Sequence, residues 1–419
     1  MNRGPGLVIV GASLAGLRAA KTARLVGYDG RITLVGEEDH LPYDRPPLSK
    51  QALDLDHEPA PDWYAFSGAG STGFEVATGE RAVALDLEAR TVRTTKGTRA
   101  YDSLIIATGA TPRTIPATPP LRGIHVLRTV EDSQAIRAAI AAGARTVVVG
   151  AGFIGAEVAT AARSQGVDVT LLEASTEPLA RAVGAMMGAS LSSMHESNGV
   201  PLLTGVTVTE FRSAGGHVRE VALSNGSALP ADLVVVGIGA APAVEWLVGS
   251  GVGLGDGVLC SPALEVLDTA GNLVPDVYAA GDVARWTNPL FGMSMRLENW
   301  TSAAEQGALA AHNSLNPNSP TAYATVPYFW SDWYGHRIQF VGVPDADEVC
   351  VVSGGHDSDT LIALYRTGQT VTGALTRNEP GLTMKLRNRI KAGDDWRATV
   401  DFVAEHLSQR SERSVEVAV

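Results

Sequence analysis

With 419 residues the chain is too long for one ordinary domain, and at roughly 150 residues per domain it predicts two to four. Its 33 basic and 45 acidic residues, a net charge of −12, argue against an electrostatic nucleic-acid binder. Two cysteines, Cys260 and Cys350, build neither a disulfide framework nor a cysteine-rich metal site, and the histidines lack metal-binding spacing. No stretch reaches the roughly 18 apolar residues that span a bilayer. We therefore expect a soluble, cytoplasmic protein of several domains without a bound metal.

The N-terminal segment has the pattern of a nucleotide-binding βαβ unit. An apolar run at 7–10, a glycine turn, a helical stretch rich in Ala and Leu and a second apolar run predict strand, helix and strand. Gly11 permits the tight turn, Gly16 lets helix and strand pack closely, and Ser13 is small enough for a pyrophosphate to approach the backbone. The helix N-terminus offers free N–H groups to the phosphates. Glu37 follows at the spacing of a ribose-binding carboxylate.

The same pattern returns between residues 146 and 173. The glycine fingerprint is complete in this copy, with Gly150, Gly152 and Gly155. Glu173 ends the second strand, where a carboxylate accepts hydrogen bonds from a ribose 2′-OH and repels a 2′-phosphate. The next basic residue along the chain is Arg181. We therefore expect NADH to be preferred over NADPH.

Three further apolar runs, at 104–107, 233–236 and 277–280, are each followed by a glycine turn. Each run predicts a buried parallel strand. Ligands bind beyond the carboxyl ends of such strands. Proline-rich links at 111–120 and 316–320 predict domain boundaries. The fold class that these patterns predict is α/β, with two Rossmann-like dinucleotide-binding domains.

Two dinucleotide-binding units in one chain are typical of a hydride relay between bound FAD and diffusible NADH. The sequence resembles the FAD-dependent, NADH-using ferredoxin reductases of oxygenase systems, of the putidaredoxin reductase and rubredoxin reductase type. The match runs from Val8 to about Gly342. Its segments are 10–16, 41–50, 106–109, 149–157, 280–282, 298–300 and 327–332, of which 42–50 and the two tryptophan segments are the most specific.

The resemblance implies a glutathione-reductase-like arrangement of domains. Residues 1–112 and 242–318 would form a discontinuous FAD-binding domain, with the NADH-binding domain inserted at 113–241. Residues 319–419 would form a C-terminal α+β domain that caps the flavin. The protein would be a monomer or a homodimer.

The resemblance also implies which residues act. Lys50, near the flavin N5, and Glu157, beside the nicotinamide, would be the catalytic pair, and their charges would stabilise the reduced flavin anion. Arg45 would lie near phosphate or adenine, Asp282 would receive the ribityl and pyrophosphate region, and Arg128 would contact the flavin. The remaining expected cofactor-binding residues are Gly11, Ser13, Ala15, Gly16, Glu37, Val83, Ala107, Thr108, Gly109, Gly150, Gly152, Ile154, Gly155, Glu173, Arg181, Gly239, Glu298, Trp300 and Trp330.

No cysteine lies between Glu37 and Ala60, so a thiolate relay beside Lys50 is excluded and electrons must leave the flavin directly. A 2Fe-2S ferredoxin that feeds a monooxygenase or dioxygenase is the acceptor that the resemblance implies. Such carriers are usually acidic, so docking needs local basic residues. Arg296 is the preferred candidate, and the second is the cluster of Lys385, Arg387, Arg389 and Lys391.

Two alternatives stay open from the sequence. One is an NADH oxidase, a quinone reductase or an NADH-responsive sensor of the same fold. The other is a flavin-binding interaction protein without catalysis. It is disfavoured, because the complete second glycine fingerprint would then have no function. Rapid bleaching of the flavin by NADH would eliminate the second alternative.

Overall fold

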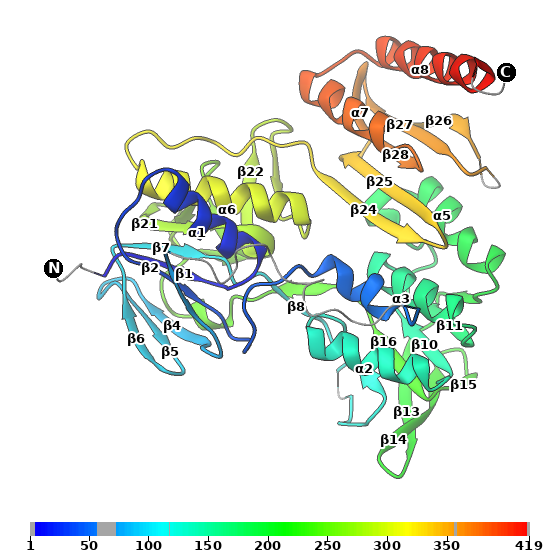
Figure 1. The fold of residues 1–419 in the computed structure, drawn as a ribbon, viewed down its shortest axis with the longest axis horizontal. Coiled ribbons are helices and arrows are strands. Elements are labelled where there is room, and N and C mark those ends of the chain that lie inside the picture. The colour runs from blue at the N-terminus through cyan, green and yellow to red at the C-terminus, as the bar shows by residue number, and fades with distance from the viewer. Residues whose placement is uncertain (1–4, 57–72, 117, 356–357, 417–419) are drawn as a thin grey trace. The chain divides into compact units, whose positions relative to one another are not determined.

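The computed structural model describes residues 5–56, 73–116, 118–355 and 358–416, and they divide into two compact units (Figure 1). The first unit comprises the described residues of 1–47, 58–113 and 240–325. The second comprises those of 48–57, 114–239 and 326–419. The C-terminal segment and the short segment around Lys50 therefore belong to the same unit as the second glycine fingerprint.

The first unit is built on a ten-stranded sheet with a parallel centre of β21, β7, β1, β2 and β3. The apolar runs of the sequence form its buried middle, because a parallel strand is covered on both faces. Its strands are β1 (Leu7–Val10), β2 (Ile32–Val35), β3 (Glu75–Ala77), β7 (Ser103–Ile106), β18 (Leu254–Gly255), β19 (Gly257–Cys260), β20 (Glu265–Leu267), β21 (Leu273–Ala279), β22 (Ala284–Asn288) and β23 (Met293–Met295).

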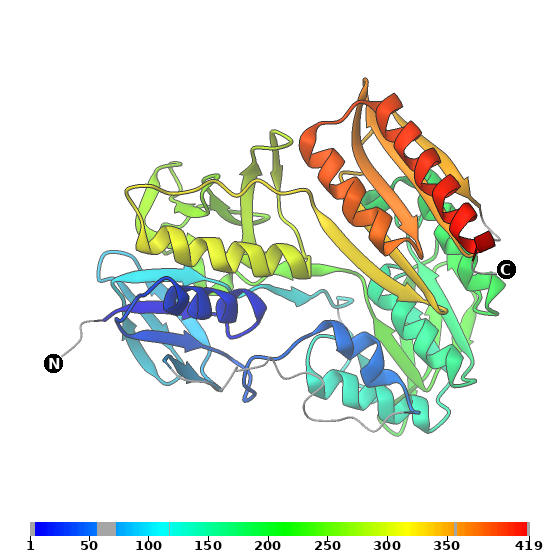
Figure 2. The ribbon, with the colours of Figure 1, turned by 45° about the horizontal axis from the view of Figure 1, so that its top comes forward.

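Two helices of the first unit, α1 (Leu14–Leu25) and α6 (Trp300–Leu315), lie side by side (Figures 1 and 2). Gly307 permits this contact, since a Cβ at that position would lie 2.1 Å from the carbonyl oxygen of Ala15. The short helix η4 (Gly281–Val283) directly follows β21, and a Cβ on Gly281 would lie 3.7 Å from the Cβ of Ala303 in the first turn of α6. Both long helices consequently begin close to the carboxyl ends of parallel strands, where dinucleotides bind in open α/β sheets.

Smaller elements complete the first unit. A three-stranded antiparallel sheet contains β4 (Ala82–Asp86), β5 (Thr91–Thr94) and β6 (Gly97–Ala100). The antiparallel pair β8 (Ala110–Pro112) and β17 (Ala240–Pro242) carries the chain out of this unit and back into it. A one-turn helix, η3 (Glu245–Leu247), follows β17.

The second unit contains a five-stranded parallel sheet in the order β12, β11, β10, β16 and β9. A three-stranded antiparallel sheet of β13, β14 and β15 packs its apolar residues, Val218 and Val221 among them, against this sheet. The strands are β9 (Ile124–His125), β10 (Thr146–Val149), β11 (Val169–Glu173), β12 (Leu202–Thr204), β13 (Val208–Ala214), β14 (His217–Leu223), β15 (Ala228–Pro230) and β16 (Leu233–Val236). The helices are α2 (Val130–Ala141), α3 (Phe153–Ser164), α4 (Ala180–Val183) and α5 (Ala185–Ser197), with η2 (Gln51–Leu53) and the last two residues of η1 (Pro46–Ser49) from the N-terminal part of the chain.

A third sheet of this unit has five antiparallel strands in the order β24, β25, β28, β27 and β26, and α7 and α8 accompany it (Figures 1 and 2). Alternate residues face opposite sides. On one face, Ile338 and Phe340 of β25 pack into a buried cluster with Met187 and Leu191 of α5. On the other face, the hydroxyl groups of Thr376 in β28 and Thr383 in α7 form a hydrogen bond of 2.6 Å. The elements are β24 (Tyr328–Trp333), β25 (His336–Gly342), β26 (Glu348–Gly354), β27 (Leu361–Thr367), β28 (Thr370–Arg377), α7 (Pro380–Ala392) and α8 (Trp396–Glu416).

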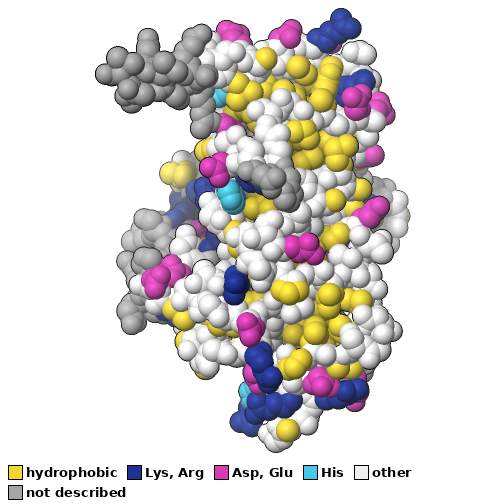
Figure 3. Space-filling view, turned by 90° about the vertical axis from the view of Figure 1, so that its right-hand side faces the viewer, with side chains coloured by type: hydrophobic (Ala, Val, Ile, Leu, Met, Phe, Trp, Pro, Cys, Tyr) yellow, Lys and Arg dark blue, Asp and Glu magenta, His cyan; other side chains and the backbone are white. Residues whose placement is uncertain are grey.

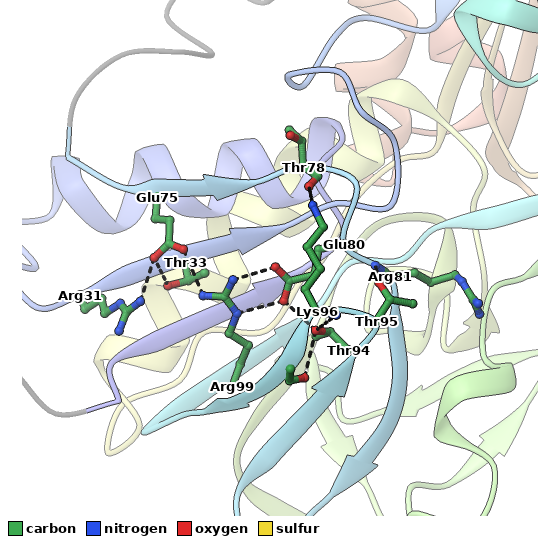
Figure 4. A network of polar contacts seen from close by, with 11 residues as sticks. Arg31, Thr33, Glu75, Thr78, Glu80, Arg81, Thr94, Thr95, Lys96 and Arg99 are labelled. Carbon is green, nitrogen blue, oxygen red and sulfur yellow. Dashed lines mark hydrogen bonds and ion pairs between the residues drawn. The ribbon is translucent and has the colours of Figure 1, made fainter.

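An ion-pair network joins the small antiparallel sheet to the edge of the large sheet in the first unit (Figure 4). The Glu80 side chain is 2% exposed. Its carboxylate forms an ion pair with Arg99 at 2.7 Å and accepts a hydrogen bond from the Thr94 hydroxyl at 2.7 Å. Arg99 also pairs with Glu75 at 3.0 Å, and Arg31 reaches Glu75 at 2.8 Å. Hydrogen bonds from Arg31 and Arg99 lower the pKa of Glu75, and those from Arg99 and Thr94 lower the pKa of Glu80.

Arg99→Ala is expected to destabilise the protein by about 1–3 kcal/mol, because the buried Glu80 carboxylate loses its charged donor. Arg31→Ala is the matched control, since its pair with Glu75 is exposed and costs less than about 1 kcal/mol. Because the folded pKa values of both glutamates are lowered, their stabilisation is present above the ordinary value of 4.5 and is lost as the pH falls through the folded values. Urea unfolding at pH 7 and below pH 4.5 measures both effects. Equal stability of the two variants at pH 7 would contradict this account.

Candidate functional site

The first glycine turn has the geometry of a nucleotide cradle. Gly11 has a φ of 120°, and a Cβ there would lie 2.0 Å from the carbonyl oxygen of Ala107. A Cβ on Gly16 would lie 2.0 Å from the carbonyl oxygen of Gly11, so the start of α1 touches the turn. Ser13 is the N-cap of α1, and its side chain makes no capping hydrogen bond. The first N–H groups of α1 are therefore available to an anion such as a pyrophosphate.

The acidic residues after β2 differ in their surroundings. Glu37, the expected ribose ligand, has a 71% exposed side chain and pairs weakly with Arg81 at 3.4 Å. Glu38 is more enclosed and binds Arg45 at 2.6 Å and the Tyr43 hydroxyl at 2.5 Å. Arg45 is thus held near the same strand end as Glu37, where the adenosine part of a dinucleotide would lie.

Other expected residues of the first unit cluster around η4 and the start of α6. Gly281, with a φ of 78°, donates its N–H to Gln306 at 2.8 Å, which holds the turn that carries Asp282. Trp300 opens α6 and donates from Nε1 to Asp44 at 2.7 Å. Gln306 is fully buried, and no local sequence pattern marks it as part of this site.

The remaining expected residues of the first unit lie on strand ends and loops. Thr108 donates from Oγ1 to the carbonyl oxygen of Ala243 at 2.8 Å, between β7 and the start of β8. Gly109, next to it, has a φ of 70°. Val83 is half-buried in β4, at an irregularity in its pairing with β5. Ala15 and Ala107 are buried beside the Gly11 turn.

The second glycine turn repeats the first cradle in the second unit. A Cβ on Gly155 would lie 2.0 Å from the carbonyl oxygen of Gly150, which itself has a φ of 105°. Gly152, the N-cap of α3, has open space where a Cβ would point, with nothing within 4 Å. A backbone with room at this position and an uncapped helix start suits a pyrophosphate. Ile154, the second residue of α3, is 50% exposed.

Glu173 is held by the backbone at the edge of this turn. Its Oε2 accepts the N–H of Ala151 at 3.0 Å, and its Oε1 accepts the N–H of Ser175 at 2.9 Å. A carboxylate fixed there suits a ribose 2′-OH and opposes a 2′-phosphate. Arg181 is exposed on α4, and Gly239 follows β16 with a φ of 93°.

Lys50 and Glu157 meet in the second unit, although 107 positions of sequence separate them. Lys50 Nζ lies 2.7 Å from Glu157 Oε1, and the side chains are 15% and 4% exposed. The hydroxyl groups of Ser49 and Ser331 both donate to the Glu157 carboxylate. The two serines were not among the expected residues, since the sequence carries no local signal for such long-range contacts.

The last two expected residues of the second unit are Arg128 and Trp330. Arg128 precedes α2, half-buried, and donates its backbone N–H to Asp132 at 2.9 Å. Trp330 lies in β24, half-buried, and its ring stacks with that of Tyr328 at 5.9 Å between centroids.

The docking role expected of Arg296 is not supported by its position. Its side chain is only 10% exposed and pairs with Asp256 at 3.1 Å and with Glu298 at 2.7 Å. The guanidinium is therefore neutralised within the first unit and is not a free surface charge. Glu298, expected at the cofactor, is the second of these partners.

The second basic cluster, on α7, divides into engaged and exposed side chains. Arg387 donates to the carbonyl oxygen of Val326, and Arg389 pairs with Asp394 at 3.0 Å. Lys385 and Lys391 are exposed, so they are the members of the cluster that could meet a partner.

Elsewhere on the second unit, Figure 3 shows basic and acidic side chains intermixed at the lower end of the face drawn, where Figure 1 places the β13–β14 hairpin. Arg212 pairs there with Glu210 and Glu220, and Arg219 pairs with Asp232 at 2.9 Å. These basic side chains are balanced by neighbouring carboxylates.

Both cysteines are free thiols, and they lie in different units. Cys260 is buried in the first unit, where burial raises the pKa of its thiol, and Cys350 lies in the second unit. Among the residues that the structure describes, no three His, Cys, Asp or Glu side chains gather as metal ligands would. Nor does any described helix combine the length and apolar composition needed to cross a membrane.

Comparison with known proteins identifies the class. Residues 5–307 match the pyridine nucleotide-disulphide oxidoreductase family and residues 328–404 the reductase C-terminal family. The chain belongs to the pyridine nucleotide-disulphide oxidoreductases, which confirms the predicted fold class and its activity as an oxidoreductase.

Individual relatives are more specific. The chain is 39% identical to the ferredoxin–NAD(+) reductase component of the biphenyl dioxygenase system of Paraburkholderia xenovorans, over 86% of each chain. It is 35% identical to rhodocoxin reductase of Rhodococcus erythropolis, over 91% of this chain and 88% of the relative. Putidaredoxin reductase, solved in a covalent complex with putidaredoxin, has a TM-score of 0.84 at 30% identity and 94% coverage of both chains. The resemblance read from the sequence motifs is thereby confirmed.

Glu173→Ala is expected to raise the KM for NADH about fivefold or more, because a hydrogen bond to the ribose is worth on the order of 1 kcal/mol. The same change is expected to improve the use of NADPH, whose phosphate no longer meets a carboxylate. Glu177→Ala, an exposed acid on the same loop, is the matched control. Steady-state kinetics with both nucleotides measure the effect, and an unchanged KM for NADH in Glu173→Ala would remove Glu173 from the site.

Proposed function

We propose that the protein is an FAD-dependent reductase that passes electrons from NADH to a 2Fe-2S ferredoxin, which supplies a monooxygenase or dioxygenase. One observation carries the proposal: two reductases, a ferredoxin–NAD(+) reductase component and rhodocoxin reductase, match 86% and 91% of the chain. Residues 328–404 also match the reductase C-terminal family. The absence of cysteine around Lys50 supports it, because a disulfide relay to another substrate cannot be built there.

The first unit holds FAD in this proposal. The α1 N-terminus binds the pyrophosphate, Glu37 binds the adenosine ribose with Arg45 nearby, and the turn that carries Asp282 receives the ribityl chain. Gln306 keeps this turn in place through Gly281. Bound FAD supplies the chemistry that one protein side chain cannot, since it accepts a hydride and releases its electrons singly.

The second unit holds NADH. The α3 N-terminus binds its pyrophosphate at Gly152, and Glu173 accepts hydrogen bonds from its ribose. Lys50 and Glu157 serve the nicotinamide end, where a buried ion pair fixes the ring and excludes water. NADH is preferred over NADPH because the Glu173 carboxylate repels a 2′-phosphate.

The partner is an acidic one-electron carrier. Lys385 and Lys391 on α7 replace Arg296 as the side chains proposed to attract it, since they are exposed. We also propose a cytoplasmic location, because NADH and the ferredoxin must share one compartment with the reductase. A monomer and a homodimer are both compatible with this function.

The decisive test combines anaerobic and aerobic reactions of the purified flavoprotein. NADH is expected to bleach the bound flavin at least tenfold faster than an equal concentration of NADPH, and then to reduce one or more members of a panel of 2Fe-2S ferredoxins. Oxygen consumption without a carrier is expected to stay slow.

Other outcomes identify the competing functions. Fast oxygen or quinone reduction without ferredoxin would indicate an oxidase or quinone reductase. A change of shape on NADH binding without turnover would indicate a sensor, and a flavin that NADH does not bleach would end the proposal of an enzyme.

A further inference from the structure

Glu157 receives more hydrogen-bond donors than its ion pair alone supplies. In addition to Lys50, the Ser49 hydroxyl donates to Oε2 at 2.5 Å, the Ser331 hydroxyl donates to Oε1, and the N–H of Asp332 lies 3.3 Å from Oε1. The side chain is 4% exposed. An ionised carboxylate only accepts hydrogen bonds, so these donors match it and hold it in one orientation.

The direction of the Ser331 hydroxyl is determined by its other neighbour. Trp333 Nε1 donates to Ser331 Oγ at 2.8 Å, and an indole N–H can only donate. Ser331 has one hydroxyl proton, which is therefore left for Glu157. Trp333 is fully buried against Phe153 and His195, with ring centroids 5.8 and 5.2 Å away, so the donor to Ser331 is itself fixed by packing.

We propose that Ser331 is a positioning residue for the reduction of the flavin by NADH. From strand β24 of the C-terminal domain, its hydroxyl holds the Glu157 carboxylate against Lys50. The proposal rests on the proposed function, because the orientation of Glu157 matters for turnover only if NADH binds at α3. It adds a role for the C-terminal domain beyond carrying Trp330 and offering a surface to the ferredoxin.

The arrangement makes the pair depend on three separate segments. Glu157 lies in α3, whose N-terminus is the proposed NADH cradle, while Ser49 ends η1 and Ser331 lies in β24. Each carboxylate oxygen has one hydroxyl donor, from a different segment. Without Ser331, Oε1 keeps the ammonium group and the distant N–H of Asp332, and the carboxylate is held by one hydroxyl donor instead of two. A small displacement of a group that orients the reacting ring costs rate more than binding.

Three variants at position 331 test the hydroxyl itself. In Ser331→Ala and in the nearly isosteric Ser331→Cys, the limiting rate of anaerobic flavin reduction by NADH is expected to fall about tenfold to a hundredfold, as for loss of a hydrogen bond to a charged group. The NADH concentration that gives half of the limiting rate is expected to change less than about twofold. Ser331→Thr, which keeps the hydroxyl, is expected to recover most of the rate.

The matched control is Ser192→Ala in α5 of the same unit, which removes a buried hydroxyl for which the described structure shows no hydrogen-bond partner. It should retain the wild-type rate. A second readout does not depend on turnover: the melting temperatures of Ser331→Ala, Glu157→Gln and the double variant are compared. If Ser331 acts through Glu157, the two shifts are not additive.

The outcomes separate this inference from the proposed function. If NADH reduces the wild-type flavin and Ser331→Cys reacts at the wild-type rate, the positioning role is overturned and the reductase proposal stands. Additive shifts in melting temperature, or a Ser331→Thr variant as slow as Ser331→Ala, would also overturn it. If NADH does not reduce the wild-type flavin, the proposed function fails first and the inference fails with it.

Discussion

The close contact between each glycine turn and the helix that follows it is the constraint on which the rest depends. In both units a Cβ on the last glycine of the fingerprint, Gly16 or Gly155, would lie 2.0 Å from the carbonyl oxygen of the first glycine. Only glycine fits, and the helix therefore begins directly at the turn with its N–H groups unshielded. Two such cradles suit a protein that binds two dinucleotides, and in the proposed function the acids that follow them bind the ribose groups.

A second constraint is the buried pair of Lys50 and Glu157. Burying two opposite charges stabilises little unless each has further hydrogen-bond partners, and removing one partner is costly. Here the additional donors come from η1 and β24, so the pair ties the C-terminal sheet to α3 and the second glycine turn. The apolar cluster that joins Ala156 and Met187 to Trp333 and Phe340 acts in the same direction. The C-terminal domain is thus part of the support for the proposed active site.

Local patterns predicted much of this structure. The first fingerprint located β1 and α1, and the second located β10, α3 and Glu173, because turn, helix start and strand end are specified by residues close in sequence. The family resemblance added Lys50 and Glu157. Contacts across long distances were not predictable in this way: Ser331 lies 174 positions from Glu157, and Gln306 reaches Gly281 from within α6. The ion pair of Arg296 with Asp256, 40 positions earlier, was likewise not predictable from the sequence.

The most direct test of two separate cradles uses one substitution in each, with absorbance of the purified protein before and after NADH. Gly11→Val is expected to give colourless protein that does not take up FAD. Gly155→Val is expected to stay yellow, with one FAD per chain, and to resist bleaching by NADH while dithionite still bleaches it. If Gly155→Val were bleached by NADH like the wild type, or if Gly11→Val kept its flavin, the assignment of one cofactor to each glycine turn would be wrong.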